Sequence, residues 1–358
     1  MKKIVLTGGG TAGHVTPNIA LLSALQAAGY EIAYVGSYEG IEKKLIADFN
    51  IPYTGISTGK FRRYLDPKNF SDPFRVMKGF VEARNYLKNY QPDVVFSKGG
   101  FVSVPVVRAA ASLHIPCIIH ESDMTPGLAN KLCIPVAEKV CCNFPETMKN
   151  IPADKAVLTG SPIRAELAEG SKLAGLNMCG FTANKPVIMV IGGSLGAANV
   201  NKAVRDALPK LLEDFQVVHL CGKDKIDNLL LNTPGYKQFE YIKAELKDIF
   251  AMADVVISRA GANAICELLA LKKPNILIPL PAASSRGDQL LNAASFEAQG
   301  YSIVLNEDDI TTNLLVDKVH ELYFNRQNYV DAMSKSHQMD AVKTIMELIN
   351  AAADKKTN

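Results

Sequence analysis

The sequence predicts an α/β protein built from two doubly wound, Rossmann-like domains, and three observations support this fold class. Short apolar runs alternate with amphipathic helical patterns along the chain, which is the order of elements that builds a mostly parallel sheet with helices on both faces. The segment Asp93–Gly100 (DVVFSKGG) is echoed by Asp254–Gly261 (DVVISRAG), which indicates that one fold unit occurs twice. A length of 358 residues also suits two hydrophobic cores better than one.

The amino-terminal half begins with a β-α-β unit. An apolar run over residues 3–7 ends at a glycine-rich segment, and a helical pattern then leads to a second apolar run over 31–36. Further strand-like runs follow at 94–96, 117–119, 140–142 and 156–158. Because Gly160–Pro162 interrupts the pattern just before Ile163, we place the first domain at residues 1–162.

The carboxyl-terminal half restarts after Pro186. A strand over 187–191 leads into the glycine loop 192–196 and a helix, and further strands are predicted at 255–257 and 275–278. We place the second domain at residues 163–340. The last segment, 341–358, has a helical apolar stripe, which we expect to pack back on the first domain, with a frayed tail from Asp354 onward.

Composition and charge exclude several classes of protein. The formal net charge of +3 argues against a general nucleic-acid binder. No apolar run approaches the roughly 18 residues of a transmembrane helix, and glycines interrupt the amino-terminal run that a signal peptide would need. The seven cysteines are scattered, with no C-x-x-C spacing, so we expect buried thiols in a reducing compartment and no metal or disulfide.

The stretch Ala253–Asn292 carries the most specific chemistry. A strand ends at Gly261 and a helix follows, whose first amides attract anions, and we expect Asn263 to cap it. Glu267, one turn into this helix, suits the hydroxyls of a ribose. The next strand leads to Gln289 and Asn292, whose side-chain amides suit a neutral polar ligand. Together these groups predict a pocket for a nucleotide sugar.

This Gly-Ala-x-x-x-x-Glu helix start, followed by a Gln-(two residues)-Asn pair, resembles the donor site of the family 28 glycosyltransferases, and the resemblance covers about Lys3 to Ile349. It implies the GT-B fold, in which two Rossmann-like domains face each other across a cleft. It also implies transfer of N-acetylglucosamine from UDP-N-acetylglucosamine, with inversion, to the 4-hydroxyl of the lipid-linked N-acetylmuramyl-pentapeptide of peptidoglycan synthesis (lipid I). The resemblance implies donor contacts from Thr11, Ala12, Gly13, Arg164, Ser194, Ile242, Ala262, Asn263, Glu267, Gln289 and Asn292.

Roles for some of these donor residues also follow from the resemblance. Ser194 should contact phosphate and the backbone of Ile242 should hold the uracil ring. Asn292 should support Gln289, which should bind the sugar hydroxyls. No metal is expected, because helix-start amides would counter the diphosphate and no Asp-x-Asp motif is present.

Three amino-terminal segments resemble acceptor elements of the same family. GGGTAGH, residues 8–14, resembles its Gly-Gly-Thr-x-Gly-His loop, and GGFVS, residues 99–103, resembles its Gly-Gly-x-Val-Ser element, with Phe101 where a Tyr is expected. HESD, residues 120–123, resembles His-Glu-x-Asn with an Asp in the last place. The resemblance implies acceptor contacts from Gly10, His14, Gly99, Gly100 and Ser103. The catalytic base is left open between His14, which a helix start should keep neutral, and the carboxylates Glu121 and Asp123.

Other functions fit parts of the sequence. Gly8-x-Gly10-x-x-Gly13 satisfies the dinucleotide fingerprint, although the acidic residue expected after the second strand is missing at Gly36–Ser37 and Glu39 only lies nearby. An NAD-dependent oxidoreductase therefore remains an alternative. A UDP-N-acetylglucosamine 2-epimerase, which shares the two-domain fold, and a binding protein without activity are the others.

The stretch 61–80 interleaves aromatic residues with cations. The helix after Pro73 carries two apolar stripes, Phe74/Met77/Val81 and Val76/Phe80/Ala83/Leu87, whereas one core needs only one. The stripe that the core does not need, beside Lys and Arg, predicts contact with an anionic membrane surface, which would place the protein peripherally at the cytoplasmic face of the cell membrane. The alternative is that the flanking loop buries both stripes.

Overall fold

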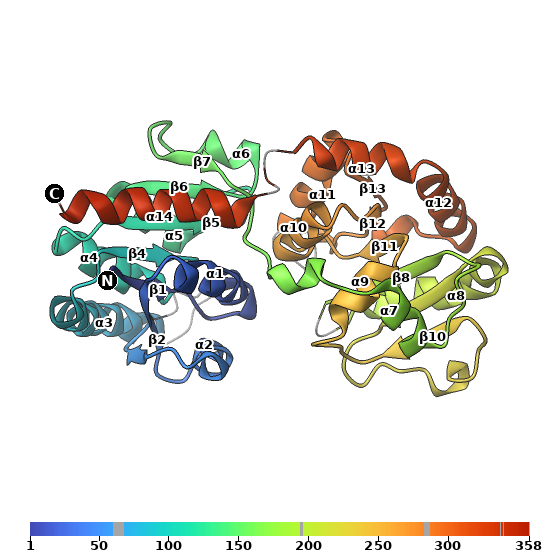
Figure 1. The fold of residues 1–358 in the computed structure, drawn as a ribbon, viewed down its shortest axis with the longest axis horizontal. Helices are drawn as coiled ribbons and strands as arrows, with labels where there is room; N and C mark the ends of the chain where they lie inside the picture. The colour runs from blue at the N-terminus through green and yellow to red at the C-terminus, as the bar shows by residue number, and fades with distance from the viewer. Residues whose placement is uncertain (60–67, 194–195, 283–286, 337, 339, 358) are drawn as a thin grey trace. The chain divides into compact units, whose positions relative to one another are not determined.

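The structure is a computed structural model that describes residues 1–59, 68–193, 196–282, 287–336, 338 and 340–357 (Figure 1). The chain divides into two compact units. Unit 1 comprises Met1–Arg164 and Asp340–Asn358, and unit 2 comprises Ala165–Met339. Each unit holds a parallel sheet with its own helices, so the predicted fold class of two Rossmann-like α/β domains is confirmed.

Unit 1 is built on a seven-stranded sheet in the order β3-β2-β1-β4-β5-β6-β7, with every described pair parallel. Its strands are β1 (Lys3–Thr7), β2 (Glu31–Ser37), β3 (Tyr53–Ile56), β4 (Val94–Ser97), β5 (Cys117–Glu121), β6 (Lys139–Cys142) and β7 (Ala156–Leu158). Its helices are α1 (Thr16–Ala27), α2 (Ile41–Ile46), α3 (Lys68–Tyr90), α4 (Ser103–Ser112), α5 (Leu128–Cys133), α6 (Pro145–Met148) and α14 (Ala341–Thr357).

The two faces of this sheet are buried by different helices, because successive side chains of a strand point to opposite faces. On β1, Val5 belongs to a core cluster with residues of α3 and α4. Its neighbours Ile4 and Leu6 belong to a second cluster with residues of α1 and α14. Since β1 is buried on both faces, it is apolar from Ile4 to Leu6, which is why the sequence predicts it so clearly.

The carboxyl-terminal helix α14 is part of unit 1. Its stripe residues Ile345 and Ile349 are fully buried in the cluster beside α1 and the sheet. The expectation of a frayed tail from Asp354 is wrong, because the helix continues to Thr357 and its end is tied down. Lys2 pairs with Asp354 at 2.6 Å, and Lys355 pairs with Glu138.

Unit 2 repeats the architecture with a six-stranded sheet in the order β10-β9-β8-β11-β12-β13. Its strands are β8 (Val187–Ile191), β9 (Gln216–Leu220), β10 (Tyr236–Phe239), β11 (Val255–Ser258), β12 (Asn275–Leu277) and β13 (Ser302–Val304). Its helices are α7 (Lys172–Cys179), α8 (Ala198–Asp214), α9 (Leu246–Met252), α10 (Ala262–Ala270), α11 (Asp288–Ala298), α12 (Thr312–Phe324) and α13 (Arg326–Ser334). Helices α8 and α12 bury one face of the sheet.

The sequence echo corresponds to equivalent positions in the two sheets. Strand β4 pairs with β1 in unit 1, and β11 pairs with β8 in unit 2. The carboxylate that precedes each strand makes the same bond: Asp93 accepts from the amide of Lys3 at 2.7 Å, and Asp254 accepts from the amide of Val187 at 2.8 Å. The repeated Asp therefore anchors the first strand of each unit to its neighbour.

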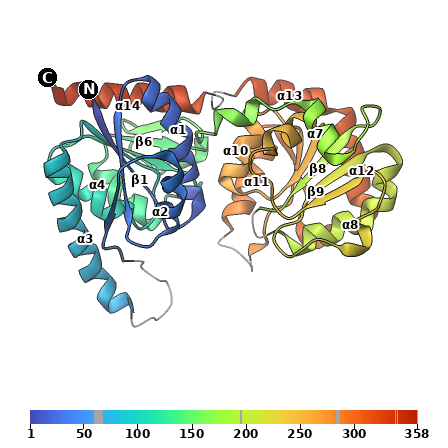
Figure 2. The ribbon, with the colours of Figure 1, turned by 60° about the horizontal axis from the view of Figure 1, so that its bottom comes forward.

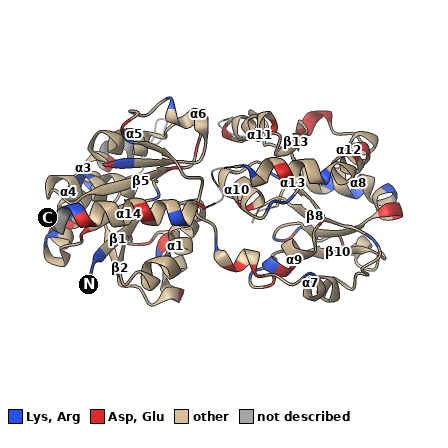
Figure 3. Cartoon of the chain, turned by 45° about the horizontal axis from the view of Figure 1, so that its top comes forward, with Lys and Arg blue, Asp and Glu red and all other residues tan. Residues whose placement is uncertain are grey.

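The surface and the thiols agree with the composition. Lys and Arg are intermixed with Asp and Glu over the described helices of each unit, as expected for a small net charge (Figure 3). All seven cysteines are free and buried, as predicted, and burial raises the pKa of Cys133 and Cys141 to about 12, so these thiols stay protonated. Among the described residues, no helix combines the length and apolarity needed to cross a bilayer.

Candidate active site

The order of the strands locates the ligand-binding edge of each sheet. Moving outward from β1, the chain runs to β2 and β3 on one side and to β4 and β5 on the other, and β8 is placed in the same way in unit 2. Ligands of open parallel sheets bind at the carboxyl ends of the strands, where the order reverses. The described residues at these two points are Gly8–His14 and Lys98–Ser103 in unit 1, and Gly192, Gly193, Gly196, Ala197 and Arg259–Asn263 in unit 2. The predicted glycine loops therefore occupy the expected positions.

The two glycine loops of unit 1 are in direct contact. The amide of Gly9 donates to the carbonyl of Gly99 at 3.4 Å. A Cβ on Gly100, whose φ is +85°, would lie 2.2 Å from the oxygen of Gly9, and a Cβ on Gly10 would lie 2.4 Å from the ring of Phe101. Predicted contact residues Thr11 and Ala12 continue the first loop as exposed residues, followed by the partly buried Gly13. Glycine is required where these two loops meet.

His14 ends the short helix η1 (Ala12–His14), just before α1. Its Nδ1 lies 2.9 Å from the hydroxyl oxygen of Thr11, and its Nε2 has no hydrogen-bond partner within the described residues. Burial, the largest effect, and repulsion from Lys98 lower the pKa of His14, Glu42 partly offsets them, and the resulting pKa is about 4. The imidazole is neutral at pH 7, as expected, although the main cause is burial and not the helix start.

Glu121 and Ser103 are both held inside unit 1. The carboxylate of Glu121 accepts from the amides of Asp123 (2.9 Å) and Gly127 (3.0 Å) and from the side chain of Asn130 (2.9 Å). The hydroxyl of Ser103 donates to the carbonyl of Gly99 at 2.8 Å and is fully buried. These side chains shape the loops from within, so the structure favours neither Glu121 as a base nor Ser103 as a direct contact.

Asp123, the third predicted base, is partly buried. Its amide is bound by Glu121 at 2.9 Å, and its carbonyl accepts from the hydroxyl of Thr147 at 3.1 Å. The segment that carries Asp123 is therefore fixed at its backbone. Of the three predicted bases, His14 is the one that combines a neutral basic nitrogen with an exposed glycine loop beside it.

Glu42 is a buried carboxylate that the sequence analysis missed. It is 0% exposed and accepts from the amide of Ser37 at 2.9 Å, from the Ser37 hydroxyl, and from the amide of Gly10 at 3.2 Å. A dinucleotide diphosphate at the Gly8-x-Gly10-x-x-Gly13 fingerprint would need such loop amides for itself. The carboxylate that holds Gly10 therefore argues against the NAD-dependent alternative.

In unit 2, helix α10 begins at Ala262 and Gly261 is its N-cap, so the prediction that Asn263 caps the helix is wrong. The chain enters the helix two residues earlier because Gly261 already has the extended backbone that a cap requires. Ala262, Asn263 and Glu267 are all partly exposed, whereas the apolar side of α10 is buried, with Ile265, Cys266, Leu268 and Leu269. The predicted donor contacts thus share the accessible side of this helix.

Helix α11 carries Gln289 and Asn292. The side-chain oxygen of Gln289 accepts from the amide of Leu280 at 3.1 Å. Asn292 is 1% exposed and donates to the carbonyl of Ala260 at 3.1 Å. This hydrogen bond of Asn292 joins α11 to the turn before α10. The prediction was that Asn292 supports Gln289, and the observed bond is a different one. The bond to Ala260 places α11, and with it Gln289, at the same edge of the sheet as the start of α10.

The remaining predicted donor residues lie on three separate segments. Ile242 is buried in the loop after β10, and neither its amide nor its carbonyl has a backbone partner in the part of the chain that the structure describes. Both groups remain available to the edge of a planar base. Arg164 is the last residue of the first segment of unit 1 and is partly exposed. Ser194 lies outside the described residues.

A buried arginine that the sequence analysis missed lies at the edge of the sheet where the donor contacts are predicted. Arg259, at the end of β11, donates to the carbonyls of Ile278 (3.0 Å) and Pro279 (3.2 Å) after β12, and it forms an ion pair with Glu307. Glu307 also accepts from Asn199 on α8 at 2.6 Å. This network joins the ends of β11 and β12 to the first turn of α8, so it holds together the loops at this edge of the sheet.

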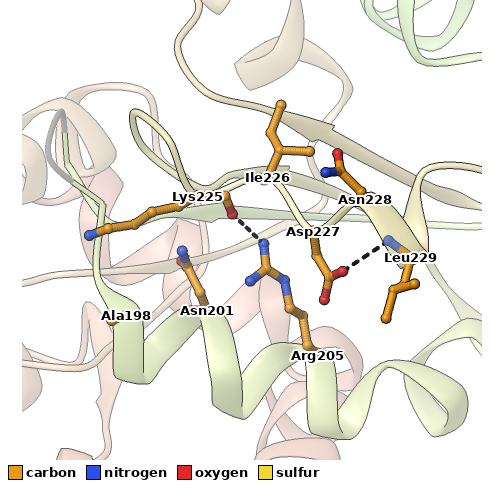
Figure 4. A pocket seen from close by; sticks show the side chains of 8 residues that line it. All are labelled: Ala198, Asn201, Arg205, Lys225, Ile226, Asp227, Asn228 and Leu229. Atoms are coloured by element: carbon orange, nitrogen blue, oxygen red, sulfur yellow. Dashed lines mark hydrogen bonds between the residues drawn. The ribbon is translucent and has the colours of Figure 1, made fainter.

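Unit 2 also has an open pocket of about 480 Å³ between α8 and the segment 225–229 (Figure 4). The guanidinium of Arg205 lies at its floor and donates to the carbonyl of Lys225 at 2.7 Å and to Gln238 at 2.9 Å. None of the predicted donor residues lines this pocket. Within the described residues, no group of three His, Cys, Asp or Glu side chains could hold a metal ion.

The fold and the two sets of strand-end loops define the class of protein: a two-domain glycosyltransferase with the GT-B fold. The solved structure of MurG from Acinetobacter baumannii superposes with a TM-score of 0.76 at 26% identity, covering 98% of this chain and all of that one. The chain belongs to glycosyltransferase family 28. The model of the family's N-terminal domain matches residues 4–142, and that of its C-terminal domain matches residues 187–349.

Two curated relatives are similar over almost their whole length. A protein of Lachnospira eligens is 65% identical, covering 98% of this chain and 99% of its own. A protein of Lachnoclostridium phytofermentans is 64% identical, covering 98% of each chain. Both are named UDP-N-acetylglucosamine--N-acetylmuramyl-(pentapeptide) pyrophosphoryl-undecaprenol N-acetylglucosamine transferase.

Proposed function

We propose that the protein transfers N-acetylglucosamine from UDP-N-acetylglucosamine to the 4-hydroxyl of the N-acetylmuramyl sugar of lipid I, the undecaprenyl-pyrophosphoryl-linked pentapeptide. The observation that carries the proposal is the donor edge of unit 2, where Glu267, Gln289 and the start of α10 lie at the switch point of a parallel sheet. The name of relatives that are 64% and 65% identical specifies the same donor and acceptor.

The donor binds to unit 2 in this proposal. The free amide and carbonyl of Ile242 pair with the edge of uracil, Glu267 accepts from the ribose hydroxyls, and Gln289 binds the sugar. The diphosphate lies against the glycine loop that follows β8 and the first turn of α8, where backbone amides attract anions. We propose that these groups suffice without a metal, so that activity in the presence of EDTA should equal activity without it.

The acceptor binds to the glycine loops of unit 1. His14, neutral at pH 7, takes the proton of the 4-hydroxyl as that oxygen attacks the anomeric carbon from the face opposite UDP, so the α-linked donor gives a β-linked product. A pKa of about 4 makes the unliganded imidazole a weak base. The pyrophosphate of the acceptor raises this pKa, because a nearby negative charge favours the protonated form.

Lipid I lies in a membrane, and α3 offers a surface to meet it. The side chains of Phe74, Met77 and Val81 are 78%, 64% and 53% exposed, whereas Ala83 and Leu87 of the other stripe are fully buried. Arg75 and Lys78 are exposed beside the first stripe, and the amino-terminal end of α3 extends past the rest of unit 1 (Figure 2). We propose that this stripe dips into an anionic bilayer at the cytoplasmic face. Residues 61–67 of the predicted stretch lie outside the described residues.

The proposal is tested by incubating the protein with labelled UDP-N-acetylglucosamine, with and without a soluble lipid I analogue. We expect label in a disaccharide lipid and release of UDP only when the acceptor is present. Conversion of the donor to its 2-epimer without acceptor would instead favour the epimerase. Tight binding of the donor with no product would favour a binding protein.

A further inference from the structure

Glu42 is a buried carboxylate that no step of the proposed reaction uses. We propose that it is a positioning residue of the loop Gly8–His14, the acceptor loop: by accepting from the amide of Gly10, it holds the turn from which Thr11 orients the ring of His14. Glu42 acts through this loop and does not touch the substrate. The link to the rate rests on the proposed function, whereas the effect on the loop belongs to the protein without substrates and is measured separately.

The burial of Glu42 runs against the polarity of the first turn of α2. Glu42 is 0% exposed, whereas its apolar neighbour Ile41 is 42% exposed. Taking a carboxylate out of water costs free energy unless hydrogen-bond donors replace the water. The stability of α2 alone would favour the reverse, with Ile41 buried and Glu42 exposed. The position of Glu42 therefore indicates a role for its hydrogen bonds outside this helix.

The two oxygens of the carboxylate bind different segments. Oε1 accepts from the amide of Ser37 at 2.9 Å and from the Ser37 hydroxyl, at the end of β2. Oε2 accepts from the amide of Gly10 at 3.2 Å, in the loop that follows β1. Because an ionised carboxylate accepts at both oxygens, it can join segments that are distant in the chain. Glu42 therefore ties the acceptor loop to the end of β2.

Two glycines leave room for this carboxylate. A Cβ on Gly9 would lie 2.5 Å from Cδ of Glu42, and a Cβ on Gly40 would lie 2.1 Å from its Oε1. A side chain at either position would have to displace the carboxylate or the backbone beside it. The acceptor loop therefore packs directly against the carboxylate as well as donating to it.

The position of Gly10 affects His14 through the residue that follows Gly10. The carbonyl of Thr11 accepts from the amide of His14 at 3.1 Å, and the hydroxyl oxygen of Thr11 lies 2.9 Å from Nδ1 of His14. Thr11 is exposed, so packing contributes little to its position. Loss of the bond between Gly10 and Glu42 should therefore let Thr11 move and should misalign the imidazole.

Glu42→Gln removes the bond to Gly10 and conserves the volume of the side chain. The amide oxygen of the glutamine can replace Oε1, which has two donors in Ser37, and its NH2 group then faces the amide of Gly10, donor against donor. Ser37→Ala is the matched control, because it removes one bond from the same carboxylate and retains the bond to Gly10. A purely structural role of Glu42 would lower the free energy of unfolding in both variants and would leave the turnover of folded protein unchanged.

The first measurement is hydrogen exchange of the Gly10 amide, followed by NMR of the full chain with isotope-labelled glycine and without substrates. We expect exchange to become at least about tenfold faster in Glu42→Gln, because a charge-assisted hydrogen bond is lost, and to change by less than about twofold in Ser37→Ala. An equal rate in the wild-type protein and Glu42→Gln, or equal acceleration in both variants, would overturn the proposal.

The second measurement is turnover with labelled UDP-N-acetylglucosamine and the lipid I analogue. We expect kcat to fall at least about tenfold in Glu42→Gln and less than about twofold in Ser37→Ala, because a misplaced base loses its alignment with the reacting hydroxyl. The dissociation constant for UDP should stay the same in both variants, since the proposed uridine contacts lie on unit 2. Faster exchange at Gly10 with an unchanged kcat would overturn the positioning role. If the wild-type protein forms no disaccharide lipid, the proposed function fails, and the exchange at Gly10 still decides whether Glu42 holds the loop.

A second variant keeps the test decisive if Glu42→Gln does not fold. Gly40 has a φ of −74°, which alanine also adopts, so Gly40→Ala adds a Cβ that displaces the carboxylate without straining the backbone. Gly127→Ala is its control, because Gly127 also precedes a short helix, with a φ of −65°, and nothing lies within 4 Å of an added Cβ. Exchange at Gly10 should accelerate in Gly40→Ala and stay unchanged in Gly127→Ala. Equal rates in these two variants would contradict the proposed role of Glu42.

Discussion

Gly100 lies directly against Gly9: a Cβ on Gly100 would be 2.2 Å from the carbonyl oxygen of Gly9, in a backbone conformation with φ of +85°. The two residues belong to the loops that leave β1 and β4, the neighbouring strands at the switch point of unit 1. The proposed acceptor surface therefore depends on a contact that only a residue without a side chain allows.

Gly100→Ala should lower the free energy of unfolding by more than the cost of placing alanine in this backbone conformation, because the added Cβ also disturbs the contact with Gly9. Gly29 has a similar φ of +77° and nothing within 4 Å of an added Cβ, so Gly29→Ala isolates the conformational cost, about 1 kcal/mol. We expect Gly100→Ala to lower the free energy of unfolding by more than about 2 kcal/mol, because it adds a steric clash. Urea denaturation measures the free energy of unfolding of both variants. Equal decreases in the two variants would show that the loops accommodate the added Cβ at no further cost.

Glu267→Ala and Gln289→Ala should weaken donor binding. Each removes a group proposed to bind UDP-N-acetylglucosamine, and the loss of one such hydrogen bond, worth about 1 to 3 kcal/mol, corresponds to roughly a 5- to 150-fold rise in the donor KM. Glu297→Ala, an exposed carboxylate on α11, is the matched control and should leave this KM unchanged. An unchanged donor KM in both Glu267→Ala and Gln289→Ala would place the donor elsewhere.

His14→Ala should separate binding from chemistry. Loss of a general base typically costs about 10² to 10⁴ in rate, so kcat should fall within that range. The dissociation constant for UDP should not change, because the proposed donor contacts of the uridine lie on unit 2. Initial rates and calorimetric titration with UDP measure the two quantities, and a variant with full kcat would remove His14 from the mechanism.

The buried histidines predict loss of stability in mild acid. Burial lowers the pKa of His219 to about 3, below the 6.5 of an exposed histidine. The unfolded chain therefore takes up a proton that the folded chain does not, so stability present above pH 6.5 is lost as the pH falls toward 3. At pH 5 the loss due to His219 is about 2 kcal/mol. His219→Gln should reduce the pH dependence of the free energy of unfolding, measured by urea titrations at several pH values. An unchanged pH dependence in this variant would show that other groups cause it.

The exposed stripe of α3 should control binding to membranes. The double variant Phe74→Ser/Met77→Ser removes two large apolar side chains from the surface, so its affinity for vesicles that contain anionic lipid should fall at least about tenfold. Its Tm should not change, since neither side chain is buried. Phe324→Ser removes a residue with a similar exposure of 74% on α12 and is the matched control. Equal affinities of the three proteins would rule out this surface.

The sequence predicts most of the central strands and the edge strand β7, but it misses the edge strands β3, β10 and β13. β1, β4 and β11 are apolar because both faces of the sheet are covered, so they stand out from the surrounding residues. β3 and β10 lie at the edges of their sheets, and polar or half-buried residues interrupt their patterns. β9 was missed although it is buried, because it contains Gln216 and His219, whose side chains are satisfied by hydrogen bonds that only the tertiary structure provides.

For the candidate site too, the sequence predicts features that depend on neighbouring residues and misses those that depend on residues far apart in the chain. The glycine loops and the start of α10 could be predicted, because strand, turn and helix signals adjoin in the sequence. Glu42 and Lys98 could not, since nothing near them in the chain distinguishes them from the exposed charges of a surface helix or loop. Their burial depends on loops from β1, β2, β4 and β5 that meet only when the sheet forms.

The most direct test of the proposed function is the structure of the lipid product formed with UDP-N-acetylglucosamine and a lipid I analogue. NMR of the purified product should show N-acetylglucosamine joined to the 4-hydroxyl of the muramyl sugar by a β linkage, with the lipid pyrophosphate intact. An α linkage, attachment at another hydroxyl, or free N-acetylglucosamine as the only product would contradict direct inverting transfer to the lipid-linked sugar.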